Sequence, residues 1–586
     1  MNNGQETILT ARSVSRGVAI GKIVCLYGGK RQFYRTALRS TQVDREIRRF
    51  NAALRLAKSQ LRRMSASSRK AAETTANILD VHRMLLEDES LIEKVEERIR
   101  DEHVNAEWAV KVVTDQYLAK YKTIADEHLR ERYIDLEDVT ERILSALGGS
   151  SNSSVRLAKN SIIAAREVRP STLVELSRSE PKGVITEHGG WTSHTFILAR
   201  EIEIPAVTGV KRILRRLKTG DDVIVDGFSG RVILNPEAKT LREFKAAAVT
   251  FAKSSADLPD LAAGPTKTLD GKEIVIRANV DLPKVYRQAK RVGAQGIGLY
   301  RSEFLFNQFK GFPAESVQVE AYRKIARTAG EDGVRIRTFD IGVELLAEET
   351  QVKEKNPALG LRAIRLGIVH QKQLKIQVRA LLQAAHETQI DIVLPMISDP
   401  GEIIYVRKII ERERERLKRR SIPFGTPRIG AMIELPAAVM VVKEIAEECD
   451  FMLLGSNDLV QYMLAVDRDN EAVADWFRTL HPAVLRAIRM VVRAAENAQK
   501  PLVLCGEMAG SPYYAPVLLG LGAREFSMNV NSIPRVRSVI SGIAYEECAE
   551  LAARMEAAGT CERTEKLLRE VVETKWRHLF PDFIPR

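Results

Sequence analysis

The sequence predicts a multidomain α/β protein whose C-terminal part is a (β/α)₈ barrel. Its 586 residues exceed what one hydrophobic core supports, which favours about three or four domains. From Thr41 to Leu147 apolar residues recur at helical spacing with almost no Gly or Pro, whereas short apolar runs alternate with helical segments after residue 258. We therefore expect a β/α domain with a helical insertion, then a linker helix, then the barrel.

The two segments that flank the helical block have the pattern of β/α structure. SVSRGVAIGKIVCL precedes the block and the stretch from SIIAAREVRP to DDVIVDGFSGRVILNP follows it, and both combine short Val and Ile runs with Gly-rich turns. We expect one β/α domain of residues 1–30 and 148–235, interrupted by a helical insertion at residues 31–147. Residues 236–259 are expected to form a single linker helix.

Eight strand-like runs follow the linker, which is the strand count of a (β/α)₈ barrel formed by residues 260–586. The runs are EIVIRANV, GIGLYR, VRIRTFD, DIVLPMI, RIGAMIEL, FMLLGS, PLVLCGE and REFSMN. In such barrels the chemistry lies at the carboxyl ends of the strands. The polar residues placed at these ends are Arg301, Glu303, Arg337, Asp340, Glu434, Asn457, Asp458, Cys505 and Glu507.

Composition limits the class of protein. Hydrophobic residues make up 45% of the chain and charged residues 28%, which is ordinary for a chain that folds throughout. No apolar run approaches the roughly 20 residues that span a bilayer, and the first residues lack the pattern of a signal peptide. We expect a cytoplasmic protein without membrane insertion. The five cysteines form no CxxC pair, so we expect reduced, buried thiols.

The chain has a formal net charge of +13. Such an excess is compatible with nucleic acid, an acidic protein partner or anionic substrates, and charge alone does not distinguish them. The densest cluster, ERERERLKRR at residues 411–420, mixes both signs and is interpreted as a solvated helix face. A nucleic-acid patch is the alternative for this cluster, and we expect no nucleic-acid partner.

A histidine motif, GGWTSHTFILAR, occupies residues 189–200 and places His194 in the first turn of a predicted helix. A neutral imidazole nitrogen is nucleophilic near pH 7, so histidine is suited to carrying a phosphoryl group. A helix N-terminus also favours an arriving anion. The tripeptide Thr-Ser-His alone is a weak signal, because a lone histidine is more often a structural residue, and only the full twelve-residue motif favours a chemical role for His194.

A second motif, DFMLLGSNDLVQY at residues 450–462, ends a predicted strand with Asn457 and Asp458. The neighbouring run GAMIELPAA ends with Glu434. Carboxylates at adjacent strand ends suit Mg²⁺, which takes a few carboxylates together with substrate oxygens. Either acid alone is also compatible with a helix cap, but the two acids beside Asn457 favour a metal site.

These motifs resemble the two signatures shared by Enzyme I of the bacterial sugar phosphotransferase system, pyruvate phosphate dikinase and phosphoenolpyruvate synthase. The helical block, through QVDREIRRF, DVHRMLLEDESL and YLAKYKTIADEHLRER, is also similar to the insertion of Enzyme I that binds the carrier protein HPr. The match follows the order of Enzyme I along essentially the whole chain. The other two enzymes need a nucleotide-binding domain for which this chain has no length.

The resemblance implies that phosphoenolpyruvate phosphorylates His194, which then passes the phosphate to HPr or a related carrier. It also implies a homodimer formed through the barrel and Mg²⁺ held by Glu434 and Asp458. An arbitrary arginine is usually at the surface and a buried cysteine is usually inert, so only their places in the motifs favour roles for them. By resemblance Cys505 donates the proton that completes pyruvate, and the substrate-binding residues are Arg301, Arg337, Arg362, Asn457, Asp458 and Arg468.

Several positions depart from the family pattern: Arg16 for Pro, Arg169 for Thr, Trp191 for Arg, Val343 to Leu345 for Gly-Asp-Lys, and Leu453 for Ser. Arg169 replaces a hydroxyl that lies close to the phosphorylated histidine in the family. We interpret Arg169 as a partner for the phosphate on His194. A regulatory binding protein without turnover is the alternative that these departures favour. The start of the chain resembles the sugar branch of the family more than the nitrogen-regulatory branch.

Overall fold

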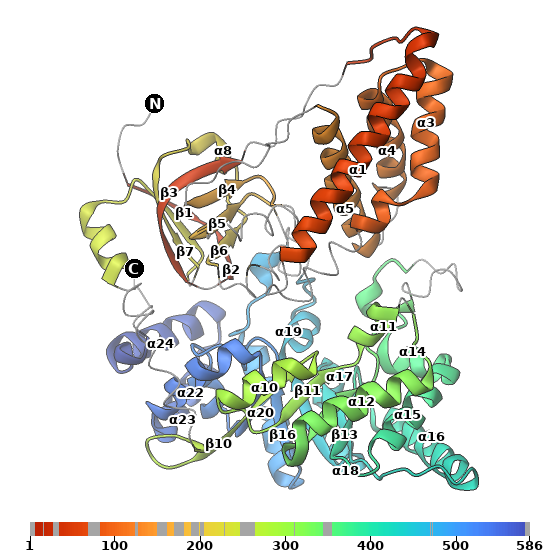
Figure 1. The fold of residues 1–586 in the computed structure, drawn as a ribbon. Helices are drawn as coiled ribbons and strands as arrows, with labels where there is room; N and C mark the ends of the chain where they lie inside the picture. Colours follow the sequence, from red (N-terminus) through yellow and green to blue (C-terminus); the bar gives the residue numbers. More distant parts are fainter. Residues whose placement is uncertain are drawn as a thin grey trace. The chain divides into compact units, whose positions relative to one another are not determined.

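The computed structural model divides into two compact units, residues 1–249 and 250–586. The residues it describes are 6–15, 17–26, 34–67, 82–122, 127–148, 161–168, 181–188, 199, 204–227, 229–246, 264–309, 311–343, 354–468, 470 and 473–580. Figure 1 shows the course of the chain through both units.

The helical block of the first unit confirms the helical pattern predicted after Thr41. Its long helices are α1 (Val43–Ser67), α3 (Glu89–Glu102), α4 (Ala106–Lys122) and α5 (Glu127–Leu147). The Asp88 side chain caps α3 by accepting a hydrogen bond from the Leu91 backbone N–H at 3.1 Å, which satisfies one of the free donors at the helix start. The apolar side of each helix faces a shared core that includes Phe50 and Val110.

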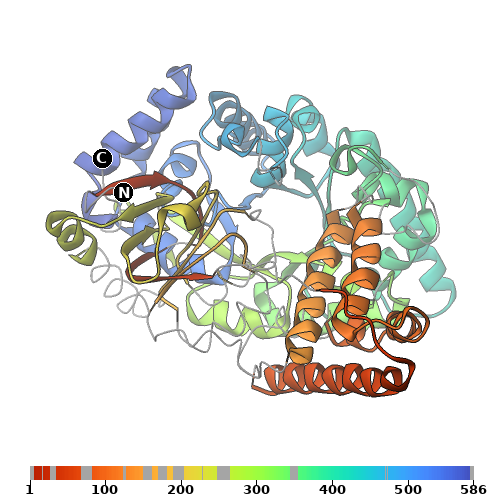
Figure 2. The ribbon, with the colours of Figure 1, turned by 90° about the horizontal axis from the view of Figure 1, so that it is seen from above.

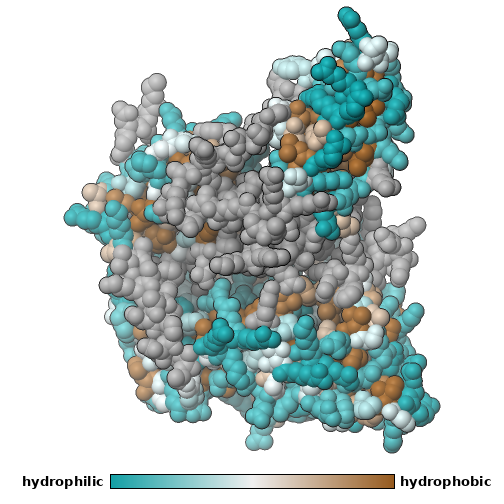
Figure 3. Space-filling view, viewed as in Figure 1, coloured by the Kyte–Doolittle hydropathy of each residue, from teal (hydrophilic) through white to brown (hydrophobic). Residues whose placement is uncertain are grey.

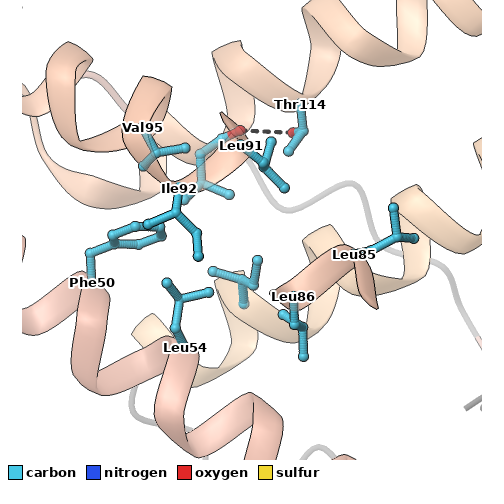
Figure 4. A pocket seen from close by; sticks show the side chains of 10 residues that line it. Phe50, Leu54, Leu85, Leu86, Leu91, Ile92, Val95 and Thr114 are labelled. Carbon is cyan, nitrogen blue, oxygen red and sulfur yellow. Dashed lines mark hydrogen bonds between the residues drawn. The ribbon is translucent and has the colours of Figure 1, made fainter. Parts of the chain in front are cut away.

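A pocket within this block is lined mainly by apolar side chains (Figure 4). Its lining includes Phe50, Leu86 and Val95, and Thr114 turns its hydroxyl to the Val110 carbonyl at 2.7 Å. No charged side chain of the described residues lines it. The pocket is therefore imperfect packing between helices and offers nothing to bind an anion.

The β/α part of the first unit is one eight-stranded mixed sheet with the order β1-β8-β7-β3-β4-β5-β6-β2. Strands β3 to β6 run parallel, and their antiparallel neighbours extend the sheet on both sides. The strands are β1 (Thr7–Thr10), β2 (Arg12–Ser15), β3 (Val18–Leu26), β4 (Ile162–Ala165), β5 (Gly183–Thr186), β6 (Ala206–Thr208), β7 (Asp222–Asp226) and β8 (Arg231–Leu234). Strand β5 leads into the segment that contains His194, which lies outside the described residues.

The second unit is a closed parallel barrel, and all eight predicted strands are confirmed. The order runs from β11 through β17 to β10, and β10 pairs with β11 to close the ring. The strands are β10 (Glu273–Val280), β11 (Ile297–Arg301), β12 (Val334–Arg337), β13 (Ile390–Leu394), β14 (Ile429–Ile433), β15 (Phe451–Gly455), β16 (Leu502–Cys505) and β17 (Glu525–Met528). Figure 2 shows the helices of this unit arranged around the strands.

The helices between the strands and after the last strand bury their apolar sides against the outside of the barrel. The longer ones are α10 (Pro283–Arg291), α12 (Glu315–Ala329), α15 (Gln371–Ala384), α16 (Pro400–Arg419), α19 (Ser456–Leu464), α20 (Pro482–Asn497), α22 (Ile533–Ser541), α23 (Tyr545–Ala557) and α24 (Cys561–Thr574). Inside the barrel a separate apolar cluster includes Leu299, Val393, Phe451 and Leu453. The barrel is thus a filled core with its polar groups at the two ends.

Charged pairs close the amino-terminal end of the barrel. Glu525 accepts a hydrogen bond from Arg335 at 2.7 Å and pairs with Arg277 as well. Arg428 binds both carboxylate oxygens of Asp391, at 2.7 and 3.0 Å. Because Arg335 is only 4% exposed, its charge depends on these carboxylates for compensation.

The described part of the linker is helical at residues 238–246, and the remainder of the predicted linker helix lies outside the described residues. The described surface visible in Figure 3 is mostly hydrophilic, with apolar areas scattered over both units. Among the described residues, no helix combines the length and the apolar composition that a membrane span requires.

Candidate active site

The carboxyl ends of the barrel strands bring together the polar residues that the sequence placed there. Arg301 and Arg337 are the last residues of β11 and β12, and Cys505 is the last residue of β16. Glu434 directly follows β14, and Asp458 lies in the first turn of α19, which begins where β15 ends. Since all eight strands run parallel, these side chains share one mouth.

Two arginines of this mouth are held by carboxylates. Arg337 contacts Asp340 at 3.1 Å and Glu303 at 3.2 Å. Arg362 binds the other oxygen of Asp340 through its Nε and Nη2, at 3.1 and 2.9 Å. Burial raises the pKa of Asp340, but Arg337 and Arg362 outweigh burial and hold it below its ordinary value. The result is a fixed, fully charged pair of guanidinium forks at the mouth.

Glu434 lies deep in the mouth and is 1% exposed. Its Oε1 accepts a hydrogen bond from the Met396 backbone N–H at 2.7 Å, whereas Oε2 has no hydrogen-bond partner among the described residues. Burial, together with the negative charges of Asp458 and Asp340, raises the pKa of Glu434 to about 8. A Cβ on Gly455 would lie 2.7 Å from Oε2, so only glycine leaves space for this carboxylate.

The start of α19 supplies the next polar groups. The Asn457 side-chain oxygen accepts a hydrogen bond from the Glu507 backbone N–H at 2.9 Å, and Arg468 lies 3.6 Å from Asp458 Oδ1. Gly506 has a φ of +103°, and a Cβ there would lie 2.3 Å from Ser456 Oγ. Both its conformation and its close contact with α19 therefore require glycine.

The carboxylates Glu434 and Asp458 fit a Mg²⁺ ion. Asp458 Oδ1, like Glu434 Oε2, is buried without a hydrogen-bond partner among the described residues. No group of three or more His, Cys, Asp or Glu side chains with metal-binding geometry occurs in the part of the chain that the structure describes. Mg²⁺ commonly takes one or two protein carboxylates and completes its shell with water and substrate oxygens, so two carboxylates that each keep an oxygen without a hydrogen bond from the described residues suit it.

Cys505 is a buried thiol at the inner wall of the mouth, 3% exposed. Its Sγ donates a hydrogen bond to the Leu454 carbonyl at 3.2 Å. Burial and the nearby Glu434 carboxylate raise the pKa of Cys505 to about 12. The group therefore remains a protonated thiol near neutral pH, which suits a proton donor better than a nucleophile.

Some residues relevant to the site were not recognised from the sequence. Glu303 and Asp340 were expected at the mouth, but their contacts with the arginines were not predicted. Gln377 on α15 was missed entirely, although its side chain binds the Phe339 backbone N–H at 3.0 Å. Glu303 and Asp340 could be recognised because each lies at the carboxyl end of a predicted strand. The sequence contains no comparable signal for Gln377.

Four of the residues singled out in the predicted phosphohistidine domain lie outside the described residues: Arg16, Arg169, Trp191 and His194. Glu344 and Leu345 of the barrel lie outside them as well. Two departures from the family pattern can be placed. Leu453 is fully buried inside the barrel, and Val343 is buried beside Phe339 and Leu366. Both side chains fill apolar clusters, which explains why apolar residues occupy these positions.

Three models of protein families match the chain in sequence. The model described as "PEP-utilising enzyme, N-terminal" matches residues 10–132, the "mobile domain" of the same enzymes matches residues 157–230, and their "PEP-binding domain" matches residues 255–545. The fold and the site thus fall within the class of phosphoenolpyruvate-utilising enzymes.

Curated relatives narrow this class. The phosphoenolpyruvate-protein phosphotransferase of Bacillus sp. (strain S) is 36% identical over 562 residues, which cover 95% of this chain and 97% of the relative. The enzyme of the same name from Staphylococcus aureus is 35% identical and covers 96% and 99% of the two chains. An NMR solution structure of an Enzyme I protein is 35% identical and covers 42% of this chain and 99% of its own, with a TM-score of 0.37. The full-length relatives show that this chain belongs to the phosphoenolpyruvate-protein phosphotransferase family.

Proposed function

We propose that this enzyme transfers the phosphoryl group of phosphoenolpyruvate to its own His194 and then to a histidine of the carrier protein HPr. The observation that carries the proposal is the gathering of arginines, two carboxylates that each keep an oxygen without a hydrogen bond among the described residues, and a protonated thiol at one barrel mouth. Phosphoenolpyruvate has a phosphate and a carboxylate, and both are anions that guanidinium forks bind by paired hydrogen bonds.

In this proposal the arginines fix the substrate and neutralise its charge. Arg337 and Arg362 are already charged and oriented by carboxylates, and Arg301 and Arg468 lie at the same mouth. Asn457 adds a polar side chain beside Asp458. Glu434 and Asp458 would hold Mg²⁺, which supplies positive charge that stabilises the phosphoryl oxygens.

The chemistry then divides into two steps. A ring nitrogen of His194 attacks phosphorus, a nitrogen–phosphorus bond forms, and the bond between phosphorus and the enol oxygen breaks. The enolate that leaves takes a proton on carbon from the Cys505 thiol and becomes pyruvate, after which the thiolate regains a proton from water. Phosphate on His194 is finally transferred to the carrier.

The carrier, the homodimer and the metal follow from membership of the family and are parts of the proposal. The helical block is assigned to carrier binding and the barrel to dimerisation. The domain boundaries at residues 30, 147, 235 and 259 also remain predictions. The structure itself divides the chain only once, into residues 1–249 and 250–586.

The proposal is tested by incubating the enzyme with labelled phosphoenolpyruvate and Mg²⁺. We expect an acid-labile phosphate on His194, release of pyruvate, and transfer of the label when HPr is added. His194→Ala should remain unlabelled, whereas His188→Ala, six residues earlier in a bend after β5, should be labelled like the parent. Label on His194→Ala, or no pyruvate from the parent enzyme, would overturn the proposal.

A further inference from the structure

We infer that Asp340 is a positioning residue that holds the two substrate arginines, Arg337 and Arg362, in one fixed arrangement. The inference deepens the proposed function and rests on it. Asp340 lies three residues beyond the end of β12 and its side chain is 5% exposed. Its Oδ2 contacts Arg337 Nη1 at 3.1 Å, and its Oδ1 accepts from Arg362 Nε and Nη2 at 3.1 and 2.9 Å. One carboxylate therefore joins two guanidinium groups.

Glu303, two residues beyond the end of the neighbouring strand β11, completes this arrangement. Its Oε1 accepts a hydrogen bond from the Asp340 backbone N–H at 2.6 Å and lies 3.2 Å from Arg337 Nη2. The ends of β11 and β12 are thereby tied to each other through charged groups. Arg337 is held on two of its three nitrogens, and its Nε is buried without a hydrogen-bond partner among the described residues. That N–H remains an unused donor within the described part of the chain.

The backbone that carries these groups is fixed from behind by buried polar side chains. Ser302 donates its hydroxyl hydrogen bond to the Arg337 carbonyl at 2.7 Å, and Gln377 donates to Ser302 Oγ at 3.1 Å. Gln377 also accepts from the Phe339 backbone N–H at 3.0 Å. Ser302 and Gln377 are 0% and 1% exposed. Buried networks whose members are satisfied favour one conformation, so the loop after β12 is held rigidly.

The segment that bears Arg362 is attached to the same loop. Gly342 and Arg362 form an isolated β-bridge, and the Ala363 backbone N–H donates to the Ile341 carbonyl at 3.0 Å. Ala363 adopts a φ of +54°, which a non-glycine residue adopts only when its surroundings enforce it. The bridge and the Asp340 contact thus hold Arg362 and Arg337 on one carboxylate, although 24 residues lie between them in the sequence.

The negative charge of Asp340 would by itself repel phosphoenolpyruvate, which has two anionic groups. Both oxygens of Asp340 are occupied by arginines, so the benefit of Asp340 to the substrate passes through them. Holding two flexible cations in place before binding removes the entropy that ordering them would otherwise cost. Asp340 is therefore a positioning residue rather than a catalytic one.

The test is the steady-state kinetics of Asp340→Asn with phosphoenolpyruvate and Mg²⁺. The amide keeps the size of the side chain but loses its charge and turns an N–H₂ group toward one arginine. We expect KM for phosphoenolpyruvate to rise about 10- to 100-fold, the range typical when a side chain that orients a ligand-binding residue is removed. Asp391→Asn is the matched control, because Asp391 also binds an arginine by two hydrogen bonds but at the amino-terminal end of β13. Its KM should equal that of the parent.

A structural role would lower the amount of active enzyme and leave KM unchanged, and that outcome would overturn the inference. Asp340→Glu provides a second variant that keeps the charge but displaces both arginines, and a parent-like KM there would also overturn it. In the Arg362→Ala background Asp340→Asn should raise KM by a smaller factor than in the parent, since one of the residues it acts through is gone. Factors that multiply fully would contradict the inference. If Arg362→Ala alone leaves KM unchanged, the proposed substrate site itself fails.

Discussion

Cys505 illustrates how burial sets the chemistry of a single side chain. A buried thiol is often inert, and Cys449, Cys548 and Cys561 are buried as well. Cys505 differs because it ends a barrel strand beside Glu434 at the mouth. A pKa of about 12 keeps its proton in place until a strongly basic group such as an enolate arrives.

Cys505→Ala should still phosphorylate His194 but should form pyruvate about 10² to 10⁴-fold more slowly, the loss typical of a positioned acid. Residual turnover is expected because water can protonate the enolate. Cys505→Ser should restore little of the rate of pyruvate formation, since a hydroxyl is a far weaker acid than a thiol. Rapid-mix measurement of phosphoenzyme beside pyruvate separates the two steps. Cys449→Ala, a buried thiol just before β15, is the control. Parent-like pyruvate release from Cys505→Ala would mean that the thiol is structural.

The second prediction for single residues concerns Glu434 and Asp458 as ligands of Mg²⁺. Glu434→Gln and Asp458→Asn should each raise the Mg²⁺ concentration that gives half-maximal turnover, or abolish turnover, because each removes one anionic ligand of a hard cation. The measurement is pyruvate release across a Mg²⁺ titration. Glu507→Gln removes an exposed acid near the same mouth and should leave the requirement unchanged. Unchanged metal dependence in both ligand variants would remove these residues from the metal site.

At the scale of elements, the barrel strands could be predicted because each is an apolar run between amphipathic helices. The two-residue strand β9 (Thr266–Lys267), which pairs with β10, is too short to leave such a pattern. The pairing of β1 with β8 joins residues more than 220 positions apart, and such pairing depends on tertiary packing. Gln377 could not be recognised for the same reason, because its role arises only when the fold brings α15 against the backbone that follows β12. Arg337 and Cys505, by contrast, could be predicted because each is the last residue of a barrel strand.

The charged closure at the amino-terminal end of the barrel supports these strands. Glu525→Gln should destabilise the barrel by about 3 kcal/mol near pH 7, the low end of the usual cost of breaking a buried pair, because it leaves the buried Arg335 with only the more distant carboxylate of Asp391, 4.0 Å away. Denaturant unfolding of the variant and the parent measures the difference. Glu562→Gln, which removes an exposed partner of Arg478, is the control and should leave the unfolding midpoint unchanged.

The Glu525 effect should depend on pH with a definite sign. Burial raises the pKa of Glu525, but Arg335 and Arg277 outweigh burial and hold it below its ordinary value of 4.5. The stabilisation is therefore complete above about pH 4.5 and is lost as pH falls through the lower pKa of the folded state. As the pH falls below 4.5, the difference between the free energies of unfolding of the parent and of Glu525→Gln should therefore shrink. A difference that stays constant down to pH 3 would contradict the ionic origin of the effect.

For the whole molecule, each unit has its own hydrophobic core. The described residues of the barrel unit bury one large cluster around its strands and two smaller ones. In the first unit one cluster joins the helical block to part of the sheet, and a second lies within the sheet. The proposed phosphate acceptor His194 belongs to the first unit, whereas the arginines and carboxylates of the mouth belong to the second. The proposed reaction therefore requires the two units to meet and separate in each cycle, as in other enzymes whose turnover depends on domain motion.

Independent cores predict that the units unfold separately, and that only one of them responds to substrate. A calorimetric scan of His194→Ala, which binds substrate without turnover, should show separate transitions. Phosphoenolpyruvate and Mg²⁺ at about 100 times the dissociation constant should stabilise the barrel by about 2.7 kcal/mol. For a unit of this size that amounts to a rise of about 4 °C in one transition. Glu525→Gln should lower the same transition and so identify it as the barrel. A single transition would show that the units unfold together and would contradict independent cores. An equal rise in all transitions would show that substrate stabilises both units and that the mouth of the barrel is not the whole binding site.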